Sequence, residues 1–238
     1  MKQPRDERSA APSTPFDLGA WLAGLSDYPP IVQAGARVLR HRAENVPSSL
    51  LATPELRNLT RLMTEVMHNA PGVGLAAPQI GVPLRVFVAE DLEERIADLP
   101  EGTATLRGRV ALPLTVLVNP KLTPEGDERV TFFEGCLSVR GYGALVPRWR
   151  AVRISGVDAE GRPVSLRLEG WPARIMQHEL DHLDGTLYID RMLSRSFATD
   201  SELPRLSGMG VDEAKRELGI PSDATPSERI PGEPGAGE

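Results

Sequence analysis

Apolar residues recur at helical spacing between residues 54 and 70, and this periodicity predicts the first long helix of the chain. Thr53 is suited to cap the start of this helix, and Pro54 suits its first position. Pro71 and Gly72 follow directly and predict its end.

A second helix is predicted over about 172–184, because Pro172 opens the segment and Gly185 follows it as a natural stop. Short strand-like runs precede it at 85–89, 115–118, 130–133, 150–157 and 163–168. The last two runs alternate apolar and polar residues around a turn, so they are predicted to form a hairpin. Short strands without a repeating strand–helix unit favour an α+β fold, with small antiparallel or mixed sheets packed around a central helix.

The domain organisation predicted from the sequence is a single folded domain over 21–195. A flexible extension is expected over 1–20 and a second extension over 196–238, which is rich in proline and glycine from residue 221 and has a possible short helix at 211–218. Residues 90–112 form an acidic, irregular insertion that could serve as a lid, a docking surface or filler, and filler is the expectation.

Charge and cysteine content narrow the function classes. The chain has 27 Lys and Arg residues against 33 Asp and Glu residues, a net charge of -6, which disfavours direct nucleic-acid binding. Its single cysteine cannot form an intramolecular disulfide, which fits a reducing compartment. No apolar run reaches the roughly 18–20 residues of a membrane span, and residues 1–20 lack a signal-peptide pattern. The cytoplasm is therefore the predicted location, with no membrane contact.

The segment with the clearest chemistry lies on the second predicted helix. His178 and His182 are four residues apart, so both imidazoles lie on one helical face and can reach a single metal ion. Glu179 lies between them, where it can take a proton from a water molecule on the metal. This His-Glu-x-x-His pattern predicts a metal-dependent hydrolase.

A catalytic site of this kind needs a third protein ligand and one open position. One large class of metalloproteases places a third histidine where this chain has Tyr188, so that longer motif fails here. Cys136 is the best remaining candidate, because a thiolate is a strong ligand for zinc or iron.

Three segments in order resemble the motifs of the peptide deformylases of bacterial type, in an actinobacterial-like variant, and the resemblance runs from about residue 31 to 192. The segments are Gly72–Gln79, Glu134–Ser138 and Gln177–His182. This resemblance implies that Cys136, His178 and His182 bind one divalent metal, with Fe(II) as the native ion and Zn, Ni or Co as replacements. It implies a hydrolase that removes the formyl group from the N-terminal formyl-methionine of newly made polypeptides and releases formate, with Glu179 as general base and then acid.

The same resemblance assigns the remaining site residues. It implies that the side-chain amide of Gln79 and the backbone N–H of Leu137 stabilise the oxyanion. The substrate is expected to lie as an extended strand beside Val73, Gly74 and Leu75 and beside the Gly141-Tyr142 segment. The methionine pocket is expected near Val73, Phe132, Trp171, Ile175 and His178. Glu134 is expected to pair with Arg148 and to hold the cysteine loop in place.

Many members of the family carry proline where this chain has Arg140, and some carry arginine where it has Gly143. These differences bear on which substrate residues are preferred after the methionine, not on the chemistry. Two other functions remain possible from the sequence: a zinc endopeptidase, and an inactive metal-containing module that binds nascent chains. The partners that the resemblance implies are formylated nascent polypeptides, with a transient ribosome contact.

Overall fold

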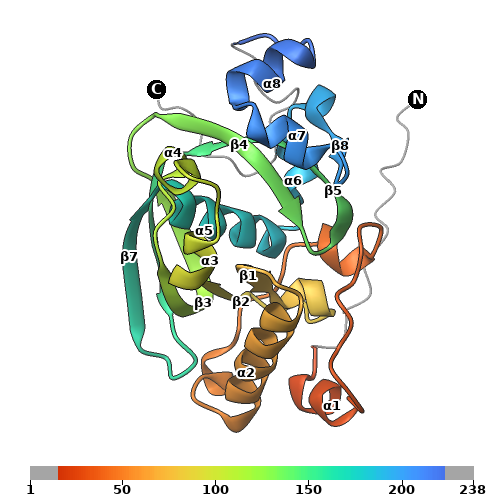
Figure 1. Cartoon of the computed structure of the whole chain (residues 1–238). Coiled ribbons are helices and arrows are strands. Elements are labelled where there is room, and N and C mark those ends of the chain that lie inside the picture. Colours follow the sequence, from red (N-terminus) through yellow and green to blue (C-terminus); the bar gives the residue numbers. More distant parts are fainter. Residues whose placement is uncertain (1–15, 223–238) are drawn as a thin grey trace, which may run out of the picture.

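Two antiparallel sheets and a central helix make up the computed structural model, which describes residues 16–222 (Figure 1). The five-stranded sheet has the order β1-β2-β3-β6-β7, with β1 Gly74–Ala76, β2 Val86–Asp91, β3 Leu112–Pro124, β6 Ala151–Val157 and β7 Pro163–Glu169. The three-stranded sheet has the order β4-β5-β8, with β4 Arg129–Cys136, β5 Val139–Trp149 and β8 Ala198–Thr199. Helix α5, Gly170–Leu183, contacts strands of both sheets, so its residues can meet side chains from either one.

Helix α2, Pro54–Asn69, packs on β1 and β2, and its buried side is lined by leucine, valine and methionine side chains. Thr53 Oγ1 accepts a hydrogen bond from Leu56 N at 3.3 Å, which caps the helix as predicted. The other helices are α1 Leu18–Ala23, α3 Glu93–Ala97, α4 Thr103–Arg107, α6 Tyr188–Arg191, α7 Leu203–Gly208 and α8 Val211–Glu217. Four 3-10 turns lie at Arg37–Arg40, Ser48–Leu50, Ala77–Ile80 and Ser194–Ser196.

The predicted α+β class, both long helices and the hairpin formed by β6 and β7 are confirmed. The predicted strands are present, although β3 and β4 are longer than expected. The expectation that 90–112 is irregular is wrong, because α3 and α4 lie within it. Glu93 and Glu94 occupy the first turn of α3, where negative charge stabilises a helix N-terminus. Strand β5 was not predicted at all.

The two extensions are only partly within the described residues, since 1–15 and 223–238 lie outside them. Helix α1 spans the predicted domain boundary at residue 20, and Leu18 is buried in the core against α2. In the C-terminal extension, Leu206, Ala214 and Ile220 are buried. Among the described residues, no helix has the length and apolar character that a membrane crossing requires.

Candidate metal centre and active site

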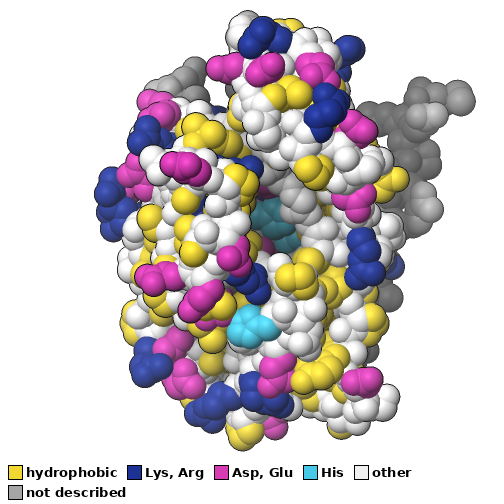
Figure 2. Space-filling model, viewed as in Figure 1, with side chains coloured by type: hydrophobic (Ala, Val, Ile, Leu, Met, Phe, Trp, Pro, Cys, Tyr) yellow, Lys and Arg dark blue, Asp and Glu magenta, His cyan; other side chains and the backbone are white. Residues whose placement is uncertain are grey.

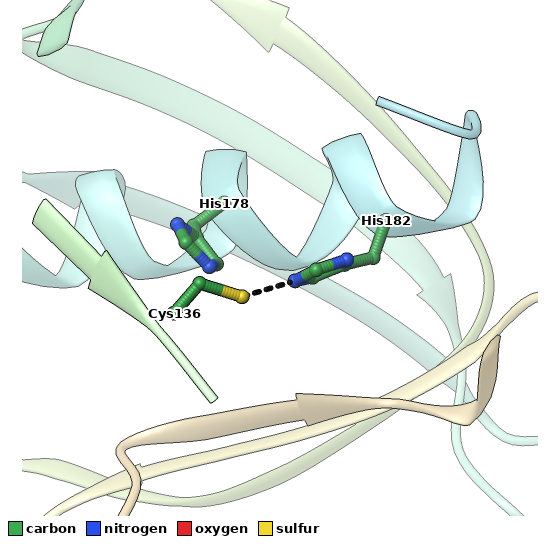
Figure 3. A group of neighbouring side chains, drawn as sticks. All are labelled: Cys136, His178 and His182. Carbon is green, nitrogen blue, oxygen red and sulfur yellow. Dashed lines mark hydrogen bonds between the residues drawn. The ribbon is translucent and has the colours of Figure 1, made fainter. Parts of the chain in front are cut away.

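Cys136, His178 and His182 converge at one point between β4 and α5, and the ligand atoms that they offer lie within 4.8 Å of one another (Figure 3). The two histidines lie one turn apart on α5, with ring centroids 5.1 Å apart. Cys136 ends β4, and its Sγ lies 3.3 Å from His182 Nε2. The structure thus brings together three side chains from two segments more than forty residues apart.

The orientation of these groups fits a divalent ion. His178 Nδ1 lies 3.0 Å from Glu134 Oε2, which leaves the opposite ring nitrogen for the cluster. Ser138 N and Gln79 Nε2 both donate toward Cys136 Sγ, at 3.4 and 3.7 Å, which suits an anionic sulfur ligand. One thiolate and two imidazoles are a donor set that Fe, Zn, Ni and Co accept, and three protein ligands leave a position open for chemistry.

Glu179 lies next to the cluster but is not one of its three members. It is only 4% exposed, and its Oε2 has no hydrogen-bond partner among the described residues. Burial raises the pKa of Glu179 to about 7. A buried carboxyl with a free oxygen and a raised pKa is equipped to accept and return a proton near neutral pH.

Gly74, in strand β1, explains how Glu179 fits into this space. A Cβ built on Gly74 would overlap the Glu179 carboxylate, with its Cδ only 2.6 Å away. The backbone of β1 therefore passes directly beside the carboxylate, and this close approach needs a residue without a side chain.

A buried ionic network around Glu134 contacts the metal cluster through the ring of His178. Arg148 donates to both oxygens of Glu134, at 2.9 and 2.8 Å, so the predicted pair is confirmed. Arg174 Nη1 adds a hydrogen bond to Glu134 Oε1 at 2.5 Å. Burial disfavours the charged form of Glu134, but Arg148 and Arg174 hold its pKa well below its usual range. Glu134 therefore stays an anion that fixes the His178 ring.

Three members of this network, Arg174, Asp181 and Arg191, were not predicted from the sequence. Arg148 also contacts Asp181, which accepts two further hydrogen bonds from Arg191 at 2.8 Å. The available signal was an arginine and an aspartate on a helix that also has to bury an apolar face, since charged residues are rarely buried without partners.

Gln79 is held in one orientation. Its Oε1 accepts a hydrogen bond from Ala76 N at 2.8 Å, so its Nε2 faces Ser138 Oγ, at 3.2 Å, and the cysteine. The carbonyl of Leu137, which belongs to the peptide between Leu137 and Ser138, accepts from Gln33 Nε2 at 3.0 Å. Gln79 Nε2 thus lies at the edge of the cluster, and Leu137 directly follows Cys136 in the chain.

A cavity of about 470 Å³ opens onto the cluster and Glu179. In the space-filling view, the middle of this face is hollowed and a histidine lies inside (Figure 2). The predicted substrate residues that line this cavity are Val73, Gly74, Tyr142, Trp171 and Ile175. The side chain of Leu75 packs in the core, so a contact with the substrate would be through its backbone. Phe132 lines a neighbouring cavity, and its ring centroid lies 6.4 Å from that of Trp171 in an edge-to-face arrangement.

The insertion over 90–112 forms part of this cavity. Arg107 and Arg109 lie over the Trp171 ring, at 5.1 and 5.4 Å from its centroid, and both line the cavity. Gly108 O accepts a hydrogen bond from Trp171 N at 3.2 Å. Because a Cβ on Gly170 would lie 2.5 Å from Gly108 O, the insertion is in close backbone contact with the start of α5. It is not filler.

The two strand segments expected to flank a substrate differ in how open they are. Strand β1 is an edge strand of its sheet within the described part of the chain. At the second segment, β8 pairs with β5 through Tyr142 and Thr199, and Asp200 N donates to Gly141 O at 2.9 Å. The rings of Tyr142 and Phe197 stack at 4.9 Å. The C-terminal extension therefore covers part of β5 beside the cavity.

Comparison with known proteins identifies the family to which the chain belongs. The family model described as polypeptide deformylase matches residues 28–197. Peptide deformylase 1 of Streptomyces coelicolor is 50% identical over 178 residues, which cover 74% of this chain and 79% of that protein. The chloroplastic peptide deformylase 1A of Solanum lycopersicum is 43% identical over 195 residues, covering 79% of this chain and 70% of that protein.

A solved structure gives the same result. The Met-Ala-Ser-bound class I type b peptide deformylase from Acinetobacter baumannii is 31% identical, with a TM-score of 0.62, over 71% of this chain and 100% of that one. The chain therefore belongs to the polypeptide deformylase family, the metal-dependent hydrolases that remove the N-terminal formyl group from newly made polypeptides.

Proposed function

We propose that Cys136, His178 and His182 hold the catalytic ion of this deformylase and that Glu179 carries the proton during hydrolysis of the formyl group. The observation that supports this most is the convergence of three ligand atoms within 4.8 Å beside a buried carboxylate oxygen without a partner. A divalent ion held by these residues supplies a Lewis acid, which lowers the pKa of a water molecule and polarises the formyl oxygen.

Glu179 takes the proton of the attacking water and returns it to the departing amine, and formate is released. A pKa of about 7 serves both halves of this cycle, since the carboxyl is neither fully protonated nor strongly acidic at neutral pH. Gln79 Nε2 and Leu137 N donate to the oxyanion that forms at the formyl carbon. The hydrogen bond from Ala76 N to Gln79 Oε1 supports this role, because it turns the amide nitrogen toward the reacting group.

The substrate is proposed to be the formyl-methionine end of a polypeptide lying as an extended strand along the open edge of β1. Val73, Trp171 and Ile175 line the cavity and would surround the methionine side chain. The Acinetobacter baumannii relative with bound Met-Ala-Ser supports a tripeptide of this kind as a ligand. Phe132 is proposed to contribute indirectly, by an edge-to-face ring contact that supports Trp171.

Fe(II) is proposed as the native ion, and Zn, Ni and Co as replacements, because one thiolate and two imidazoles suit all four. The test is metal analysis of protein purified without oxygen, followed by removal of the metal and reloading with each ion in turn. Iron in the fresh protein, with the fastest formate release after reloading with Fe(II), is the expected result. Zinc in the fresh protein, with full activity, would contradict the assignment.

The endopeptidase and the inactive binding module are not favoured by family membership. To distinguish a deformylase from an endopeptidase, the metal-loaded chain is incubated with formyl-Met-Ala-Ser and, separately, with an unformylated, unfolded protein. We expect formate from the first and no cleavage of the second. Cleavage of the unfolded protein, or no formate from the peptide, would overturn the proposal.

Nascent polypeptides are the proposed partners, met in a transient contact with ribosomes in the cytoplasm. The single cysteine supports a reducing compartment. Co-sedimentation with ribosomes that carry formylated nascent chains tests the contact, and no enrichment over empty ribosomes or a control protein would contradict it.

A further inference from the structure

A second cavity, of about 270 Å³, lies on a different face of α5 from the metal cluster. Gln177, Leu180 and Asp181 line it, whereas His178 and Glu179 line the active-site cavity. Neighbouring residues on a helix face in different directions, so α5 separates the two cavities. The volume is below the range of about 300–1,000 Å³ that is usual for drug-sized ligands, so a small ligand would suit it.

The lining of this cavity carries an excess of positive charge. Two acidic residues face six basic ones, namely Arg42, Arg85, Lys121, Arg129, Arg148 and Arg191. The whole chain has a net charge of -6, so this concentration of cations is not a consequence of overall composition. A cleft lined mainly by one sign of charge focuses the electrostatic field and attracts ions of the opposite sign.

Both acidic residues in the lining are already paired. Asp181 accepts from Arg148 and Arg191, as described above. Asp184 accepts from Arg85 Nη1 at 2.7 Å and lies 3.6 Å from Arg42 Nε. Each aspartate therefore faces two arginines, and Arg148 also pairs with Glu134 outside the lining, whereas Lys121 has no acidic partner in the described part of the chain.

Arg85 is the residue that points most directly to a ligand. It is only 5% exposed, yet not all of its N–H groups donate hydrogen bonds to protein atoms. Its Nη1 donates to Leu183 O and to Asp184 Oδ1. Its Nε and Nη2 donate to no other residue in the described part of the chain, and Lys121 Nζ likewise has no partner there. These two nitrogens are not fully enclosed by protein, so they stay accessible, and an oxyanion in the cavity would accept hydrogen bonds from them.

We propose that this cavity binds a phosphate group. The planar fork of a guanidinium matches the oxygens of phosphate, and a lysine ammonium adds a point charge beside it. The proposal concerns a site separate from deformylation, because α5 lies between this cavity and the metal cluster. The phosphate could belong to a small free ion or to a single strand of RNA, and the test distinguishes these two sources.

The test is isothermal titration of the full-length, metal-loaded chain at low ionic strength with inorganic phosphate, pyrophosphate and a mixed-sequence RNA of twelve nucleotides. The variant is Lys121→Glu, and the matched control is Lys215→Glu in α8, where the same charge change is made outside the cavity. We expect binding to weaken about tenfold or more in Lys121→Glu and to stay unchanged in Lys215→Glu. Formate release should be unchanged in both variants.

Each outcome decides the proposal. Binding of phosphate or pyrophosphate that is lost in Lys121→Glu supports it and identifies a small free anion. Tighter binding of the RNA, lost in the same variant and weakened by salt, supports it and identifies a nucleic-acid phosphate. No binding of any of the three ligands, or binding that Lys121→Glu does not weaken, would overturn it.

Discussion

Gly74 in β1 lies against the carboxylate of Glu179 in α5, so close that a Cβ on Gly74 would lie 2.6 Å from Glu179 Cδ. The two residues are far apart in the sequence, and the contact exists because α5 packs on β1. Gly74 does not have a positive φ, so its backbone conformation does not require glycine. Glycine is needed here because a side chain would overlap the Glu179 carboxylate. The position of the catalytic carboxylate therefore depends on a missing side chain.

Gly74→Ala should reduce kcat for formate release about 10²-fold, because the new methyl group displaces the carboxylate that moves the proton. The metal content should not change, since Glu179 is not a member of the ligand cluster. Gly208→Ala is a suitable control, because a Cβ there meets no atom within 4 Å. A Gly74→Ala variant as active as the parent would show that Glu179 does not need this position.

Gln79→Ala should lower kcat by about 10²–10³-fold with little change in KM, because an oxyanion donor acts mainly on the transition state. The measurement is steady-state formate release from formyl-Met-Ala-Ser. The substitution also leaves Ala76 N without its acceptor, so the unfolding midpoint should be measured alongside. A rise in KM at constant kcat would instead indicate a role in substrate binding.

Glu134→Gln should lower the free energy of unfolding by about 3–5 kcal/mol, because it leaves Arg148 and Arg174 buried without their shared anion. It should also weaken metal binding about 10–100-fold through the lost partner of His178. Urea unfolding and a metal competition titration measure the two effects. Glu128→Gln is the control, because its ion pair with Arg150 is exposed and little change is expected. Equal stability of the two variants would contradict the role of the network.

Arg107→Ala should raise KM for formyl-methionine substrates about 2- to 10-fold with little effect on kcat, because Trp171 loses one of the cations over its ring. The control is Leu106→Ala, since Leu106 is 67% exposed and does not line the active-site cavity. Steady-state kinetics with both variants tests whether the insertion shapes the methionine pocket. Equal KM values for Arg107→Ala and the parent would leave the insertion without this role.

Sequence patterns predicted the features that depend on local order. Thr53 caps α2 because the cap and the N–H that it accepts are three residues apart, and His178 and His182 share a face because of helix geometry alone. The ion network was mostly missed, because the partners of Arg174 and Asp181 lie on other elements. Arg174 meets Glu134 of β4, and Asp181 meets Arg148 of β5, only when these strands pack on α5. Strand β5 was also missed, although it forms a hairpin with the preceding β4; only its Tyr142–Gly143 end pairs with the distant β8.

The same limit applies to the substrate side of the site. Nothing in the sequence around Arg107 indicates that it lies over Trp171, because the two residues meet only through the close approach of Gly108 and Gly170. Leu75 was expected to meet the substrate through its backbone, and that its side chain packs in the core could not be read from the sequence, since the faces of β1 cannot be assigned from three residues.

The most direct test of the central claim is formate release by Glu179→Gln, with its metal content measured in the same preparation. The account predicts a kcat lower by about 10²–10⁴-fold and a metal content equal to that of the parent chain, because the carboxylate moves the proton and does not hold the ion. Undiminished formate release from a fully metal-loaded variant would contradict it.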